Sequence, residues 1–221
     1  GTTTDSPVPV STGSASTSSS GTYITSITAG YDFTCNFSVT GLRCWGENSS
    51  GQMGNGNTTD VLTPTAVPAV TGFANNNNIV SITAGGQTMC ATTNASKIWC
   101  WGKNNAGQVG DNTLINKTVP TLVLDNPSAS FTNGDLNEST MGDTTGARGI
   151  AVSRSITDGF ACVTKWCWGA NNDGQLAQTN TTDVALPSQV KIGTISADDV
   201  TGVVVTAALK SGGVEVTFTG L

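Results

Sequence analysis

Short runs of β-branched and aromatic residues, interrupted by polar turns, recur along the chain from about residue 23. The run SITAG occurs at 26–30 and again at 81–85, and a looser version lies around Ile150. Each is followed by a hairpin-like sequence: NFSVTGLR, ATTNASKIW or VTKW. Apolar or β-branched residues on both sides of a short polar turn are typical of β-hairpins. The pattern therefore predicts an all-β chain built from antiparallel hairpins.

A longer repeat is superimposed on these hairpins. Residues 44–53, 100–109 and 167–176 align without a gap and share the letters C-W-G-x-N-x-x-G-Q. The alignment continues to a proline at the same distance in each copy, and a valine follows three residues later. The distance from the second copy to the third is longer than that from the first to the second, because it contains an insertion at 126–149 that is rich in Gly, Thr, Asn and Asp. A fixed repeat of this length predicts stacked structural units.

Each repeat has a second cysteine upstream, so that two cysteines flank each hairpin turn. The C-terminal residues 208–218 copy the hairpin without either cysteine: Thr217 takes the second cysteine position, Phe218 the tryptophan position, and Ala207 or Ala208 the first cysteine position. Joint loss is what pairing predicts. The chain has no CxxC spacing and no histidine, which disfavours redox and zinc sites. The expected disulfides join Cys35 to Cys44, Cys90 to Cys100 and Cys162 to Cys167, and they imply an oxidising compartment.

These residues resemble the regulator of chromosome condensation repeat, especially its bacterial extracellular version, over about residues 23–221. The resemblance implies four-stranded blades of a β-propeller, usually seven to a ring, and the eukaryotic founder of the family is a guanine nucleotide exchange factor on chromatin. The chain departs from the pattern in three ways. No histidine precedes the first cysteine, Ala177 replaces the last glycine of G-Q-x-G, and there are far fewer than seven repeats.

Two regions are expected: a Ser/Thr-rich stalk or linker at 1–21 and a repeat domain at 22–221. The domain divides into repeats at about 23–78, 79–147 and 148–191 and a degenerate partial fourth at 192–221. Because three and a half blades cannot close a ring, apolar blade faces need a cover. We expect either further blades or a homo-oligomer, with a trimer favoured, as at the tip of a trimeric adhesive surface fibre.

Charge and composition exclude several functions. Charged residues make up 11% of the chain and the net charge is −6, so no basic stripe is available to a nucleic acid. No apolar run approaches the roughly 20 residues of a membrane-spanning helix, so no membrane insertion is expected. Without histidine, the Ser/His and Cys/His nucleophile systems are absent. We expect no enzyme activity, no cofactor and no metal.

The remaining candidates concern binding. The tryptophans of the three CWG copies occupy a fixed repeat position, which indicates packing between blades. Trp99 and Trp166 lie two residues earlier and are candidate ligand contacts, as are Asp135, Asn137 and Arg148 in the insertion. We expect an extracellular or cell-surface recognition and adhesion module that binds a bacterial cell-surface glycan or envelope component. The alternative is a structural spacer or assembly domain without a ligand of its own.

Overall fold

The computed structural model describes residues 23–74, 78–126, 150–163 and 166–190, four isolated positions before residue 9, and the backbone of two strands at 204–210 and 213–219. Contacts divide the chain into two units, Gly1–Val190 and Lys191–Leu221, and each is described by itself. The fold is all-β, as the hairpin pattern predicted. The insertion and most of residues 1–21 lie outside the described residues.

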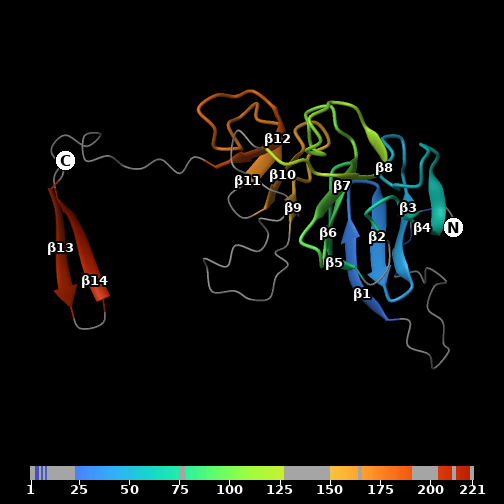
Figure 1. Cartoon of the computed structure of the whole chain (residues 1–221), viewed down its shortest axis with the longest axis horizontal. Helices are drawn as coiled ribbons and strands as arrows, with labels where there is room; N and C mark the ends of the chain where they lie inside the picture. The colour runs from blue at the N-terminus through green and yellow to red at the C-terminus, as the bar shows by residue number, and fades with distance from the viewer. Residues whose placement is uncertain are drawn as a thin grey trace. The chain divides into compact units, whose positions relative to one another are not determined.

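The first unit contains three four-stranded antiparallel sheets, which we call blades 1, 2 and 3 (Figure 1). Every blade has its strands in chain order, so each strand pairs with the next. Blade 1 comprises β1 (Ile24–Ala29), β2 (Phe33–Ser38), β3 (Gly41–Gly46) and β4 (Val61–Ala66). Blade 2 comprises β5 (Ile79–Gly85), β6 (Thr88–Thr93), β7 (Ile98–Gly102) and β8 (Lys117–Leu122). Blade 3 comprises β9 (Ala151–Val152), β10 (Phe160–Val163), β11 (Trp166–Gly169) and β12 (Val184–Gln189).

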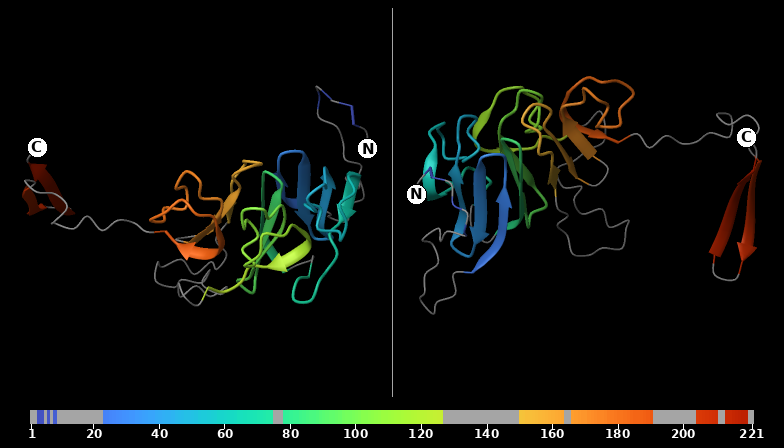
Figure 2. Two further views of the ribbon diagram at one scale, coloured as in Figure 1. Left: turned by 90° about the horizontal axis from the view of Figure 1, so that it is seen from above. Right: turned by 180° about the vertical axis from the view of Figure 1, so that it is seen from behind.

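The first strands of the three blades lie next to one another, since β1 contacts β5 and β5 contacts β9. The blades follow one another in chain order, as the colours of Figure 2 show. This is the arrangement of consecutive propeller blades around an axis.

A disulfide joins the two central strands of each blade. Cys35 faces Cys44, Cys90 faces Cys100 and Cys162 faces Cys167, each pair with its Cα atoms 4.1 Å apart. All three predicted pairs are confirmed. In blade 3, Val163 lies opposite Trp166, also as the short hairpin predicted.

The second unit contains one hairpin, β13 (Val204–Lys210) and β14 (Gly213–Thr219). A degenerate fourth hairpin was predicted here, but its register differs from the prediction. Thr206, not Ala207 or Ala208, lies opposite Thr217, and Val205 lies opposite Phe218. The prediction carried over the separations of 9 and 10 residues between the paired cysteines of blades 1 and 2, whereas the residue opposite Thr217 lies one position further upstream.

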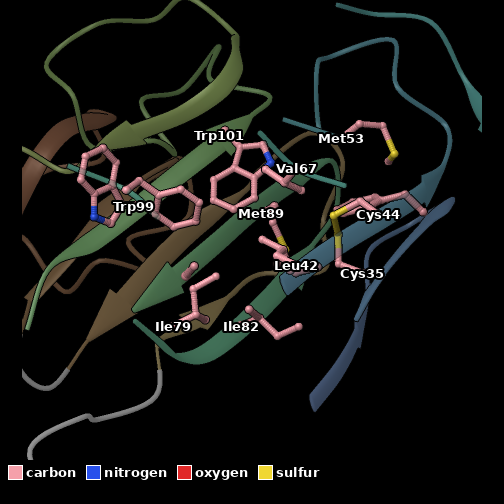
Figure 3. Packing of buried hydrophobic residues seen from close by; sticks show 14 residues of the cluster. Cys35, Leu42, Cys44, Met53, Val67, Ile79, Ile82, Met89, Trp99 and Trp101 are labelled. Atoms are coloured by element: carbon pink, nitrogen blue, oxygen red, sulfur yellow. A yellow bond between two sulfur atoms is a disulfide. The ribbon is translucent and has the colours of Figure 1, made fainter. Parts of the chain in front are cut away.

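The hydrophobic core is divided between the two blade junctions. One cluster combines side chains of blades 1 and 2 and includes Leu42, Met53, Met89 and Trp101 (Figure 3). A second cluster combines blades 2 and 3 and includes Trp168. Each junction thus buries the faces of two sheets against each other.

A hydrogen bond from the repeat tryptophan crosses each junction. The indole Nε1 of Trp101 donates to the backbone oxygen of Gln52 at 3.0 Å, and that of Trp168 donates to the backbone oxygen of Gln108 at 2.9 Å. Trp101 and Trp168 are fully buried, whereas Trp45 in blade 1 is partly exposed and makes no such bond to a described residue. The predicted packing role of this repeat position is therefore confirmed at both junctions.

The G-Q-x-G turn that supplies this carbonyl is held on two sides by the next blade. A Cβ on Gly54 or Gly110 would lie 2.7 or 2.8 Å from the indole nitrogen of the following blade. On the other side of the turn, a Cβ on Gly107 would lie 2.5 Å from the Cα of Ala185 in β12. These glycines repeat because the turn has positive φ and because the next blade leaves no room for a side chain.

A buried asparagine organises the loop between the third and fourth strands of each blade. Asn104, fully buried, accepts from the backbone nitrogen of Val109 at 2.8 Å and donates to the backbone oxygen of Thr113 at 2.9 Å. Asn48 and Asn171 are also fully buried and make the corresponding bonds. Twelve residues after each asparagine, a side-chain oxygen accepts from the asparagine's own backbone nitrogen at 2.9 Å; the three acceptors are Asp60, Asn116 and Asp183.

In blade 2 this loop also holds an ion pair. Lys117 Nζ lies 2.6 Å from Asp111 Oδ2, and Asp111 is 8% exposed. Burial raises the pKa of Asp111, but the hydrogen bonds from Lys117 and Thr113 and the positive charge of Lys117 outweigh it and hold this pKa below its ordinary value. The ionised carboxylate is therefore stabilised in the folded chain.

Removing the indole N–H should cost stability only where the hydrogen bond crosses a junction. We expect Trp101→Phe and Trp168→Phe each to lower the free energy of unfolding by about 1–3 kcal/mol, since a buried carbonyl loses its partner. Trp45→Phe is the matched control and should change it by less than about 0.5 kcal/mol. Urea unfolding followed by circular dichroism measures the three values, and equal losses would contradict the role of the bond.

The lowered pKa of Asp111 predicts a pH dependence. Its ion pair stabilises the fold above the ordinary carboxyl pKa of about 4, and this contribution disappears as the pH falls through the lower folded-state value. We expect Asp111→Asn to be less stable at pH 7 by about 1 kcal/mol, and its stability to fall less steeply than that of the wild type below pH about 4. Thermal unfolding between pH 2 and 7 tests this. The exposed Asp173→Asn serves as control and should follow the wild-type profile.

Candidate binding site

A pocket of about 270 Å³ lies where loops of all three blades meet. Its lining residues come from the end of β1, the end of β5 and the segment after β9: Ala29, Gly30, Tyr31, Gly85, Gly86 and Arg154. We call it the three-blade pocket. Because each blade supplies the segment that follows its first strand, the pocket sits at one end of the three adjacent first strands.

Glycines allow the backbones of neighbouring blades to approach each other here. The backbone nitrogen of Tyr31 donates to the oxygen of Gly86 at 2.7 Å, which joins blade 1 to blade 2. A Cβ on Gly85 would lie 2.2 Å from the backbone oxygen of Ser153, and one on Gly86 the same distance from that of Ser155. The glycine of the repeated SITAG run is thus needed where blade 2 meets blade 3. Four of the six lining residues, Ala29, Gly30, Gly85 and Gly86, are glycine or alanine.

Two large side chains give the pocket its chemical character. Tyr31 is 62% exposed, so most of its ring is accessible to solvent. Arg154 is exposed and makes no ion pair or hydrogen bond with the rest of the described chain. It is the one charged side chain among the residues that line the pocket. The pocket lining thus combines one aromatic ring and one guanidinium, groups of the kind that orient a bound ligand.

The structure places the predicted ligand contacts elsewhere. Trp99 and Trp166 are 7% and 3% exposed and belong to the cores of the two blade junctions, so neither presents a ring face to solvent. Trp99 packs against Phe73 with ring centroids 5.5 Å apart. Asp135, Asn137 and Arg148 lie outside the described residues.

Among the described residues, no group of three or more His, Cys, Asp or Glu side chains is arranged to hold a metal ion. The same part of the chain contains no helix long and apolar enough to span a membrane.

Comparison with known families and structures agrees with the repeat pattern and the blades. The family model described as the regulator of chromosome condensation (RCC1) repeat matches residues 44–92 and 96–133, and a second model of that repeat matches residues 79–108. Residues 44–133 are therefore similar to the RCC1 repeat. The resemblance inferred from the CWG copies is supported over that part of the chain, and the blades agree with the propeller fold that it implies.

Two relatives that the chain matches are plant proteins longer than it. The chain is 31% identical over 156 residues to the mitochondrial RCC1 domain-containing protein RUG3 of Arabidopsis thaliana. This match covers 69% of the chain and 30% of RUG3. It is 31% identical over 105 residues to the ultraviolet-B receptor UVR8 of the same plant, covering 47% of this chain and 23% of the receptor. The chain thus spans less than a third of either relative.

Among solved structures, Prp20p of Saccharomyces cerevisiae, described with its binding to Gsp1p and histones, superimposes with a TM-score of 0.53 at 18% identity. That match covers 76% of this chain and 38% of Prp20p. The yeast RCC1 protein bound to Kap60 gives a TM-score of 0.51, also at 18% identity, over 90% of this chain and 42% of that one. At this identity the likeness shows the propeller fold and nothing about ligands.

Sequence reasoning missed Tyr31 and Arg154. A signal was present, because Tyr31, Gly86 and Arg154 occupy the same position after the first strand of their blades, and the repeat keeps no single residue type there. Their proximity was not readable, because it depends on how three separate blades pack.

Proposed function

We propose that this chain is an extracellular or cell-surface recognition module that binds a surface glycan or envelope component through the three-blade pocket. The observation that carries the proposal is the pocket itself: three blades converge on a small concave site with one exposed aromatic ring and one unpaired guanidinium. Concave sites with few convergent polar groups are typical of small-ligand binding.

The disulfides support the choice of compartment. Every blade of the first unit has one, and no cysteine of the described residues is free. Disulfides persist outside the reducing cytosol. The net charge of −6 and the shortage of basic residues also argue against a chromatin-associated role.

Carbohydrate rings match the pocket in size and character. A volume of about 270 Å³ is slightly below the roughly 300–1,000 Å³ typical of drug-sized ligand sites, which suits one or two sugar units. The exposed ring of Tyr31 offers an apolar surface for the C–H face of a sugar.

A glycan array and whole-cell binding test the proposal. We expect the wild type to bind a restricted set of glycans, and Tyr31→Ala to lower that binding by at least about fivefold, the loss typical of a central contact residue. Tyr23→Ala is the matched control, because Tyr23 is 76% exposed and precedes β1, whereas Tyr31 follows it. Absence of binding to any glycan or cell surface would favour a structural spacer instead.

A further inference from the structure

The geometry points to a more specific ligand, and this inference rests on the proposed function. We propose that the three-blade pocket recognises an acidic sugar, whose carboxylate pairs with the guanidinium of Arg154 while its ring lies against Tyr31. The class of ligand is a single ring that bears a carboxylate, such as a uronic acid.

Arg154 is a cation without an internal partner. It lines the pocket, it is exposed, and no carboxylate of the described residues lies within ion-pair distance of it. Its planar fork of N–H donors fits a carboxylate with two parallel hydrogen bonds. In a chain with net charge −6, a guanidinium without a partner at the meeting point of three blades would favour an anionic ligand over a neutral one.

Two charged side chains, Asp158 and Lys103, make hydrogen bonds within or to the loop that carries Arg154. The carboxylate of Asp158 accepts from Thr157 Oγ1 at 2.6 Å and from Asn172 Nδ2 at 2.9 Å. Lys103 Nζ donates to the backbone oxygen of Ile156 at 2.6 Å, which ties blade 2 to the loop that carries Arg154. These contacts hold the loop in place and leave the guanidinium as the available donor.

The shape of the site favours one planar or chair-like ring over a multiply charged anion. Phosphate and sulfate sites usually gather several cations or a series of backbone N–H groups. Here a single guanidinium stands beside a 62% exposed aromatic ring, and the backbone nitrogen of Tyr31 is already bonded to Gly86. This combination matches one negative charge attached to an apolar-faced ring.

Titration with D-glucuronate and with D-glucose tests the inference, using heteronuclear NMR to locate the bound sugar through the amide signals of Gly85 and Gly86. We expect the wild type to bind glucuronate at least about tenfold more tightly than glucose. The carboxylate of glucuronate can accept charge-assisted hydrogen bonds from Arg154, and glucose has no such group. Arg154→Gln should remove that preference, and Arg154→Lys should restore part of it. Arg43→Gln is the matched control: this arginine lies on β3 and does not line the pocket.

The outcomes separate this inference from the function on which it rests. Equal binding of glucuronate by the wild type and Arg154→Gln, no binding of glucuronate, or displacement of glucuronate by an equal concentration of inorganic phosphate would overturn the acidic-sugar assignment. If the wild-type protein still binds neutral glycans on the array, the proposed function survives that result. Glucuronate binding that depends on Arg154 supports the assignment even if the protein attaches to no cell surface. Circular dichroism of each variant confirms that it is folded.

Discussion

The arrangement of the blades depends on one repeated contact, in which the G-Q-x-G turn of blade 1 is held by blade 2 and that of blade 2 by blade 3. On one side of the turn, the tryptophan indole of the following blade donates its N–H to the backbone oxygen of the turn's glutamine. On the other side, the turn packs against the fourth strand of that following blade. A blade whose sheet has apolar side chains on both faces is not stable with those faces in water, so it needs a neighbouring blade to cover them. Because the contact fixes the distance between blades, it also fixes where their first loops converge. The three-blade pocket is a consequence of that spacing.

Much of this could be predicted from the letters alone. Cys, Trp, Gly and Gln recur at fixed positions of the repeat because each has a separate structural role. The hairpins, the disulfides and the packing role of the repeat tryptophan could therefore be predicted from their spacing. Asn48, Asn104 and Asn171 recur at one position of the repeat, and only the structure shows that they are the buried centres of their loops. Their acceptors Asp60, Asn116 and Asp183 were overlooked, although the constant offset was visible in the sequence.

The binding site could not be predicted in the same way. Trp99 and Trp166 lie two residues before the repeat tryptophan, and so on the same face of the strand. Because that face was predicted to pack between blades, the prediction that these two rings contact a ligand conflicted with the repeat pattern. The structure shows that this face packs against the neighbouring blade. Tyr31 and Arg154 occupy equivalent positions of blades 1 and 3, and only the packing of the blades brings both to the lining of one pocket.

Two glycines at equivalent positions allow a direct test of the contact between blades. Gly107 and Gly174 both have positive φ, but a Cβ on Gly107 would meet β12 of the next blade, whereas one on Gly174 would meet nothing within 4 Å. Alanine at either position incurs the backbone strain, and only Gly107→Ala also crowds a neighbouring blade. The decisive measurement is the difference in free energy of unfolding between the two variants. Our account predicts that Gly107→Ala is less stable than Gly174→Ala by at least about 1 kcal/mol; equal stabilities would contradict it.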